Sequence, residues 1–165
     1  MGHIVGKAGV KVDPKNIEAM QDWPHPKTLK ILHGFLGLTG YYRKFVKNYG
    51  KIASPLTALL KKNSFTWIPF AAQAFQTLKM AMCTTSVLAL PDFTKTFVLE
   101  CDASGKGISV VLMQEGRPLA FTSKQLSERN LGKSIYEKEM LAILHVVDLW
   151  FPYLLGKRFQ IKTDH

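Results

Sequence analysis

Three carboxylates in the second half of the chain stand where side chains could do chemistry. Asp102 and Asp164 each end a stretch that alternates apolar and polar residues, FVLECD and FQIKTD, and this pattern predicts two half-buried strands. If those strands pair in parallel, the two carboxylates lie side by side at matching strand ends, where open α/β sheets hold their sites. Asp102 also suits a plain turn, because Asp-Ala-Ser-Gly is common turn chemistry.

The third carboxylate, Glu139, lies on a long amphipathic helix predicted between those two strands. The apolar face of this helix comprises Tyr136, Met140, Ile143, Val147, Trp150 and Leu154. At about 100° per residue, Glu139 falls within roughly 60° of the centre of that face, so we expect it to point toward the core or its edge. A buried carboxylate is costly unless it is paired or binds a cation. The alternative is a border position from which the side chain reaches water.

A cluster of these three carboxylates would set like charges against one another. Such a cluster raises at least one pKa unless divalent cations neutralise it. Ligand sets made of oxygen alone select hard cations, so Mg²⁺ or Mn²⁺ is the expected partner. Two such ions about 4 Å apart would stabilise the attacking and leaving oxygens in phosphodiester cleavage. The residues therefore predict a catalytic metal site built from Asp102, Glu139 and Asp164.

The elements that must position these groups follow from the pattern of the second half. Strands are expected at residues 96–102, 108–114, 118–123 and 158–163. The long helix should begin at a capping box formed by Ser134 and Glu137 and end before Gly156. The order predicts three antiparallel strands, then a helical crossover to a fourth strand that pairs in parallel.

The first half predicts a hairpin followed by helices. A hairpin is expected at residues 3–12, and Asp13 and Pro14 should cap and start a short helix. Thr28 should cap a longer helix to about residue 46, with a stripe formed by Leu29, Leu32, Leu36, Tyr41 and Phe45. Further helices are expected at about residues 52–62 and 69–83.

Glycines at positions 34, 37 and 40 of the longer helix permit close approach to another helix or to a ligand, and packing within the protein is the favoured interpretation. Charge balance and pattern both change between residues 63 and 90. We therefore expect two domains, residues 1–66 and 67–165.

The net charge of +10 is concentrated in the first half of the chain. No carboxylate occurs between Asp22 and Asp92, although that interval is rich in lysine. Such a segment favours a polyanion such as nucleic acid, and a solvated basic face is the alternative. The expected binding residues are Lys27, Lys30, Arg43, Lys44, Lys47, Lys51, Lys61 and Lys62.

Several classes of protein are disfavoured by the sequence. The two cysteines are too far apart to suggest a disulfide framework, and we expect reduced thiols in an intracellular protein, cytoplasmic or nuclear. We expect no membrane span, because the longest apolar stretch is interrupted by His145, Asp148 and Pro152. No phosphate-binding glycine loop is found, so no small-molecule cofactor is expected.

Longer stretches of the sequence carry a resemblance to a known family. CDASGKGISVVLMQEGRPLAFTSKQLSERN and YEKEMLAILHVVDLWFPYLLGKRFQIKTDH closely resemble the RNase H region of gypsy-type LTR retrotransposon polyproteins. The segment from GHIVGKAGVKVDPKN to KIASPLTALLKK looks like the end of the reverse transcriptase palm and its thumb or connection helices. The resemblance covers nearly the whole chain. It implies a mixed α+β or α/β fold, in which an N-terminal hairpin and a helical thumb-like segment precede an RNase H-like domain.

The resemblance also implies a function. Members of the family use Mg²⁺ to cut the RNA strand of RNA–DNA hybrids, and the metal ligands implied here are Asp102, Glu139 and Asp164. The basic helices would track the hybrid or a template–primer duplex, alongside the remainder of a Pol polyprotein. An alternative is a catalytically inactive, nucleic-acid-binding remnant of such an element.

Two departures from the family limit these expectations. No Tyr-x-Asp-Asp occurs in this chain, so DNA synthesis by it alone is not expected. The family fold continues past the Thr-Asp-His motif with more helices, a fifth strand and a fourth carboxylate. We therefore expect an RNase H-like domain truncated at its C-terminus.

Overall fold

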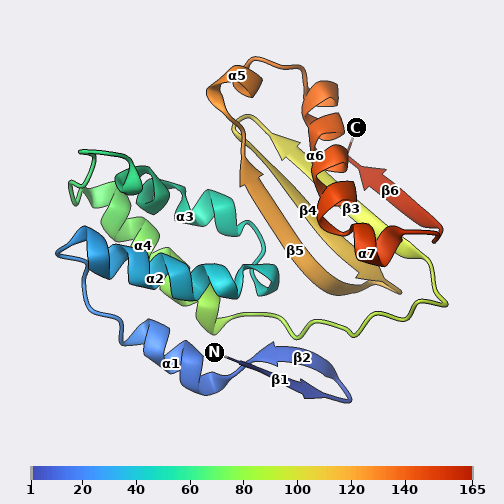
Figure 1. Cartoon of the computed structure of the whole chain (residues 1–165), viewed down its shortest axis with the longest axis horizontal. Helices are drawn as coiled ribbons and strands as arrows, with labels where there is room; N and C mark the ends of the chain where they lie inside the picture. Colours follow the sequence, from blue (N-terminus) through green and yellow to red (C-terminus); the bar gives the residue numbers. More distant parts are fainter. Residues whose placement is uncertain (1, 165) are drawn as a thin grey trace.

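The computed structural model describes residues 2–164, which form a small hairpin, a group of helices and a four-stranded sheet (Figure 1). In chain order the elements are β1 (His3–Gly6), β2 (Gly9–Val12), α1 (Pro14–Gln21), α2 (Leu29–Tyr41), η1 (Arg43–Phe45), α3 (Tyr49–Thr57), η2 (Ala58–Leu60), α4 (Pro69–Cys83), β3 (Phe97–Ser104), β4 (Gly107–Gln114), β5 (Arg117–Gln125), α5 (Glu128–Leu131), α6 (Ile135–Leu149), α7 (Phe151–Leu154) and β6 (Phe159–Thr163). Within residues 2–164, no helix is long and apolar enough to cross a membrane.

The N-terminal hairpin and α1 form as predicted. The Asp13 carboxylate accepts a hydrogen bond from the Lys15 backbone N–H at 2.9 Å and so caps α1. Val10 of β2 exchanges two backbone hydrogen bonds with Leu88, of 2.7 and 2.8 Å. The segment that follows α4 is thereby attached to the hairpin.

Helix α2 begins at its Thr28 cap but ends earlier than expected. It stops at Tyr41, and the predicted continuation to residue 46 is a separate 3₁₀ turn, η1. The predicted apolar stripe is also partly wrong, because Leu29 and Tyr41 are exposed while Phe35 is fully buried. The buried face is set by packing on α4, where the ring centroid of Phe35 lies 4.6 Å from that of Phe75.

The remaining helices of the first half lie close to their predicted positions. Helix α4 has its predicted bounds, whereas α3 starts three residues early and ends in the 3₁₀ turn η2. Close packing at Gly34 is confirmed, because a Cβ atom there would lie 2.9 Å from the Trp23 ring. No such contact exists at Gly37, where a Cβ atom would meet open space.

The helices enclose a first hydrophobic core that includes α4. Its buried side chains run from Val12 to Leu88 and include Phe75 and Leu78 of α4. Residues 67–83, which the predicted division assigns to the second domain, therefore pack with the first-half helices.

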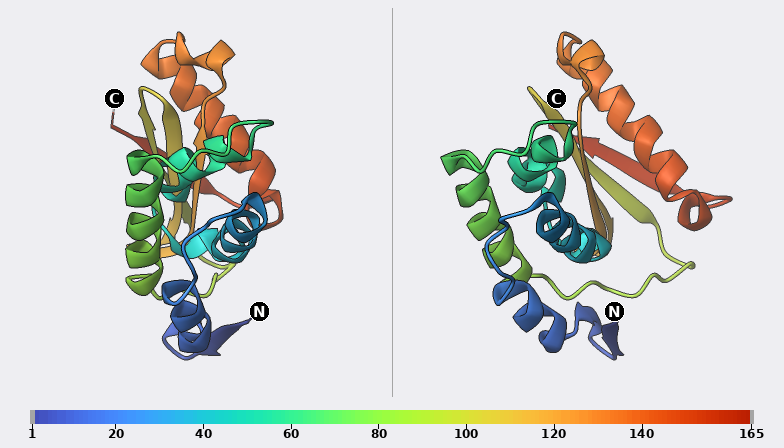
Figure 2. Two further views of the ribbon diagram at one scale, coloured as in Figure 1. Left: turned by 90° about the vertical axis from the view of Figure 1, so that its left-hand side faces the viewer. Right: turned by 60° about the vertical axis from the view of Figure 1, so that its left-hand side comes forward.

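The second half forms a mixed sheet with strand order β5-β4-β3-β6. Strands β3, β4 and β5 pair antiparallel, and β6 pairs parallel with β3, which confirms the predicted topology. Helix α6 lies on one side of this sheet and α3 on the other (Figure 2). A second core forms under α6 from alternate residues of β3, including Phe97, Leu99 and Cys101.

Helix α6 starts at the predicted capping box but differs in two respects. It ends at Leu149 and a separate short helix, α7, follows, since Pro152 lacks the N–H that a continuous helix needs. Its buried face includes Glu139, Ala142 and Val146, whereas Tyr136 and Met140 of the predicted face are exposed. Ala142 is fully buried in the second core, although it is smaller and less apolar than the exposed Met140.

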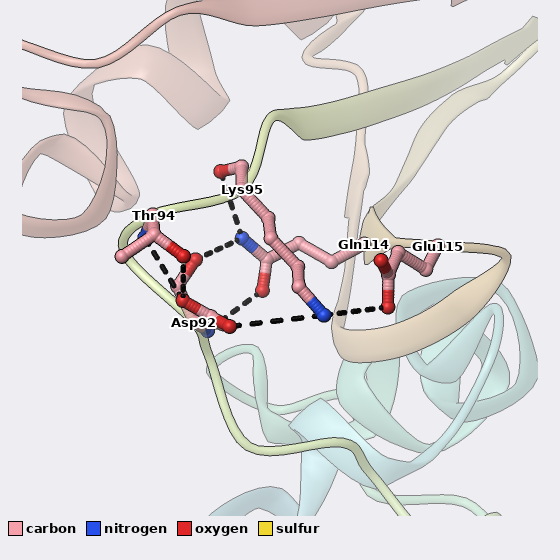
Figure 3. Close-up of polar contacts among 5 residues, drawn as sticks. All are labelled: Asp92, Thr94, Lys95, Gln114 and Glu115. Atoms are coloured by element: carbon pink, nitrogen blue, oxygen red, sulfur yellow. Dashed lines mark hydrogen bonds and ion pairs between the residues drawn. The ribbon is translucent and has the colours of Figure 1, made fainter.

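The segment entering β3 is held by polar contacts with the β4–β5 turn (Figure 3). The buried Gln114 amide donates to the carbonyl oxygens of Asp92 and Lys95 and accepts from the Asp92 N–H at 2.8 Å. The Lys95 ammonium lies 2.9 Å from the Glu115 carboxylate. Hydrogen bonds from Thr94 hold the pKa of Asp92 below its ordinary value. These contacts fix the start of the strand that carries Asp102.

Candidate functional site

Asp102 and Asp164 lie side by side near the C-terminal ends of the parallel strands β3 and β6. Cys101 of β3 is in register with Thr163 of β6, so the following residues of the two parallel strands are neighbours. Both carboxylates line one cavity of about 420 Å³, together with Lys47. The predicted adjacency of these two side chains is confirmed.

The face of the sheet on which Asp102 lies follows from strand alternation. Cys101 and Ala103 are buried beneath α6, so Asp102 projects from the opposite face and is exposed. There it also lines a second cavity, of about 290 Å³, with Lys51 and Lys106. Asp102 thus faces the helices of the first half of the chain, which we call the helical unit, and it lies between lysine side chains.

Glu139 lies at the same end of the sheet but on the other face. It is buried on α6, only 6% exposed, as its inward position on the helix predicted. Burial, with a smaller contribution from the Glu139 charge, raises the pKa of the Cys101 thiol to about 11. The neighbouring Lys138 ammonium donates to the Gly105 carbonyl at 3.0 Å, which ties this turn of α6 to the β3–β4 turn.

Asp102 and Asp164 line one cavity, and Glu139 is not among the residues that line it. Among residues 2–164, no group of three or more histidine, cysteine, aspartate and glutamate side chains is placed to hold a metal ion. The alternation of residues along the strand indicates the face of the sheet on which Asp102 lies, because Asp102 is out of phase with the apolar residues Leu99, Cys101 and Ala103. The structure therefore brings together two of the three predicted ligands, Asp102 and Asp164.

All eight predicted nucleic-acid-binding residues are exposed. In the part of the chain that the structure describes, the ion pairs join Lys95 to Asp92 and Glu115, and none involves these eight residues. Lys47 and Lys51 flank Asp102, whereas Arg43, Lys44 and Lys61 line cavities beside β5. Lys27, Lys30 and Lys62 line none of these cavities.

Additional basic residues come from the sheet, where the sequence predicted none because the charges there balance. These are Lys106, Lys124 and Lys162. Their positions in the strands and turns could have indicated them. Lys162 is in register with Glu100 on the face of Asp102, and Lys106 lies in the turn after β3.

One serine joins the helical unit to the sheet. The Ser123 hydroxyl of β5 accepts a 2.7 Å hydrogen bond from the Gly50 N–H, and the Ser123 carbonyl accepts one of 3.1 Å from the Arg43 guanidinium. Arg43 also lies over the Tyr49 ring, at 5.2 Å from its centroid. These contacts hold the basic helices against the face of the sheet that carries Asp102.

The mixed sheet, its covering helix and the aspartates at adjacent strand ends define an RNase H-like class of protein. The family model described as "RNase H-like domain found in reverse transcriptase" matches residues 67–161. The chain therefore belongs to this family.

Relatives cover the whole chain and extend well beyond it. The retrovirus-related Pol polyprotein from transposon 297 of Drosophila melanogaster is 43% identical over 167 residues, spanning 100% of this chain and 16% of that protein. The corresponding polyprotein from transposon gypsy of the same organism is 38% identical and covers 100% of this chain and 17% of its own length. The chain thus spans less than a fifth of these relatives, and the resemblance to gypsy-type Pol polyproteins is confirmed.

A solved structure shares the fold of the entire chain. The foamy viral protease–reverse transcriptase in complex with RNA/DNA hybrid superposes with a TM-score of 0.91, at 22% identity, over 100% of this chain and 23% of that one. This likeness establishes the fold.

Proposed function

We propose that this chain is the part of a retrotransposon Pol polyprotein that holds an RNA–DNA hybrid or template–primer duplex. One observation carries the proposal: the eight exposed basic side chains of residues 27–62 form no ion pair within the described residues. Unpaired Lys and Arg side chains bind phosphates and release counterions, which supplies much of the affinity for nucleic acid.

Lys47 and Lys51 are the residues expected to contact the backbone nearest to Asp102. Both are exposed, and each lines a cavity that also contains Asp102. A phosphodiester held by these lysines would lie over the face of the sheet that carries both aspartates. Such contacts depend on backbone charge and are expected to be independent of base sequence.

The salt dependence of hybrid binding tests this proposal. Replacing Lys47 and Lys51 by glutamine should lower the slope of log affinity against log salt concentration by about 1.8, since each phosphate that a lysine no longer neutralises removes about 0.9. The matched control replaces Lys7 and Lys15, which are exposed on the hairpin and α1. An unchanged slope in the first variant, or an equal change in the control, contradicts the proposal.

A second candidate is cleavage of the RNA strand of the hybrid. It is favoured by the adjacent aspartates, whose oxygen atoms suit Mg²⁺ or Mn²⁺, and by the position of Glu139 at the same end of the sheet. Because Glu139 lies on the other face, the arrangement shown supports binding better than hydrolysis. No small-molecule cofactor is proposed.

The two functions are separated by incubating this chain with a labelled RNA–DNA hybrid in Mg²⁺ and then in Mn²⁺. Cleavage that disappears in Asp102→Asn supports the ribonuclease. Salt-sensitive binding without cleavage, from protein that unfolds cooperatively, leaves the binding function alone.

A further inference from the structure

A groove runs along the outer strand of the sheet and adjoins the cavity of Asp102, with which it shares Ser123 and Lys124. Residues 119–124 of β5 line a cavity of about 530 Å³. Arg43 and Lys44 of η1 line it as well, and so do Leu149 and Tyr153 near the end of α6 and in α7. We call this cavity, with its neighbour described next, the β5 groove.

The neighbouring cavity extends the positive charge of the groove. It has a volume of about 340 Å³, shares Arg43, Ser123 and Lys124 with the first and adds Lys61. Within the described chain, no aspartate or glutamate lines either cavity. Burial, and then the charges of Lys124 and Arg43, lower the pKa of His145 in the same wall, and the Asp148 charge opposes this shift. Arg43, Lys44, Lys61 and Lys124 make the lining of the groove positive, and an anionic occupant complements it.

The opposite wall of the groove is apolar and accessible. Leu149 is 48% exposed and Tyr153 is 37% exposed. A base-paired duplex keeps its base faces stacked inside, so it offers nothing to such a wall. Unpaired bases expose apolar faces that pack against aromatic and aliphatic side chains while their phosphates bind lysine and arginine.

We propose that the β5 groove binds single-stranded nucleic acid, with phosphates on Lys44, Lys61 and Lys124 and unpaired bases against Leu149 and Tyr153. The inference deepens the proposed function, since it rests on nucleic-acid binding by this chain. It assigns Lys44 and Lys61, two of the eight basic residues, to the unpaired strand next to a hybrid or primer terminus, on a surface that adjoins the duplex site through Lys124.

Fluorescence anisotropy with a labelled oligothymidine and with a blunt RNA–DNA hybrid tests the proposal. In the variant carrying Lys44→Gln and Lys124→Gln, the salt slope for the single strand should fall by about 1.4, since each phosphate of a single strand accounts for about 0.7. Replacing Lys7 and Lys15 should leave that slope unchanged.

A second pair of variants tests the apolar wall. Leu149→Ser should weaken binding of oligothymidine by about fourfold for each CH₂ group that no longer packs against a base. Leu144→Ser is the matched control, because Leu144 lies on the same helix, is 60% exposed and lies outside the groove. Neither change should alter binding of the blunt hybrid.

The outcomes separate this inference from the proposed function. If hybrid binding depends on Lys47 and Lys51 but single-strand binding is unchanged in the groove variants, only the groove proposal is overturned. If the unaltered chain binds neither probe, both proposals are overturned. Displacement of oligothymidine by an acidic peptide as effectively as by a second oligonucleotide shows recognition of charge alone, and it also overturns the groove.

Discussion

Asp102 and Glu139 lie at the same end of the four-stranded sheet, on opposite faces of it. Asp102 is exposed toward the helical unit, whereas Glu139 is buried on the side of α6 that packs against β3. Strand alternation produces this separation, because Asp102 follows Cys101, whose side chain is buried under α6.

The two carboxylates should therefore differ in their effect on stability. We expect Glu139→Ala to lower the free energy of unfolding by about 1–3 kcal/mol, because it removes a buried polar group together with its interactions. Asp102→Ala should change it by no more than about 0.5 kcal/mol, as for most surface substitutions. Urea unfolding measures both values. Equal losses would place the two side chains in one environment, contrary to the structure.

The attachment of the helical unit to the sheet should depend on Ser123. Ser123→Ala leaves the Gly50 N–H without its 2.7 Å acceptor in a part-buried position, so the free energy of unfolding should fall by about 1–3 kcal/mol. Ser104→Ala is the control, since Ser104 is exposed on β3. Hydrogen exchange should show faster exchange at Gly50 in the first variant only. Unchanged protection there would refute the attachment.

Gly9 should tolerate substitution far less than Gly6, although both lie in the same hairpin. Gly9 has φ +130°, and a Cβ atom there would collide with the Leu88 carbonyl, whereas nothing lies within 4 Å of a Cβ atom at Gly6. Gly9→Ala should therefore lower the free energy of unfolding by more than about 1 kcal/mol, and Gly6→Ala by less. Thermal unfolding monitored by circular dichroism compares the two, and the reverse order would contradict the hairpin contact with Leu88.

Local chemistry in the sequence predicted much of this fold. Asp13, Thr28 and Ser134 each cap a helix as expected, because a cap depends only on the next few residues. The parallel pairing of β3 with β6 followed from the order of elements. These features need no knowledge of distant partners.

The missed features depend on distant partners. The buried face of α2 packs against Phe75 of α4, and that of α6 packs on the sheet, where Ala142 is fully buried. The face of the sheet on which Asp102 lies was not used when the carboxylates were grouped by strand end, although strand alternation indicates it. Lys124 was missed because its neighbours in the groove, Arg43 and Lys44, are about eighty residues earlier in the chain.

The two cysteines should react very differently with a thiol reagent. Cys83 is exposed on α4, whereas Cys101 is 3% exposed, and burial raises its pKa from 9.0 to about 11. Because the thiolate is the reactive form, one thiol should be modified in the native protein and the second only on unfolding. Mass spectrometry of peptides identifies the modified site, and rapid modification of Cys101 would contradict its burial under α6.

The same thiol should make stability fall at alkaline pH. Between pH 9 and about 11 the unfolded chain releases the Cys101 proton while the native protein keeps it, so the contribution of this thiol to stability is present below pH 9 and is lost as pH approaches 11. Lysines and tyrosines also titrate in this range, so the measurement is the difference between the unaltered protein and Cys101→Ala. That difference should shrink from pH 8 to pH 10.5, and a constant difference would show that the native thiol ionises at its ordinary pKa.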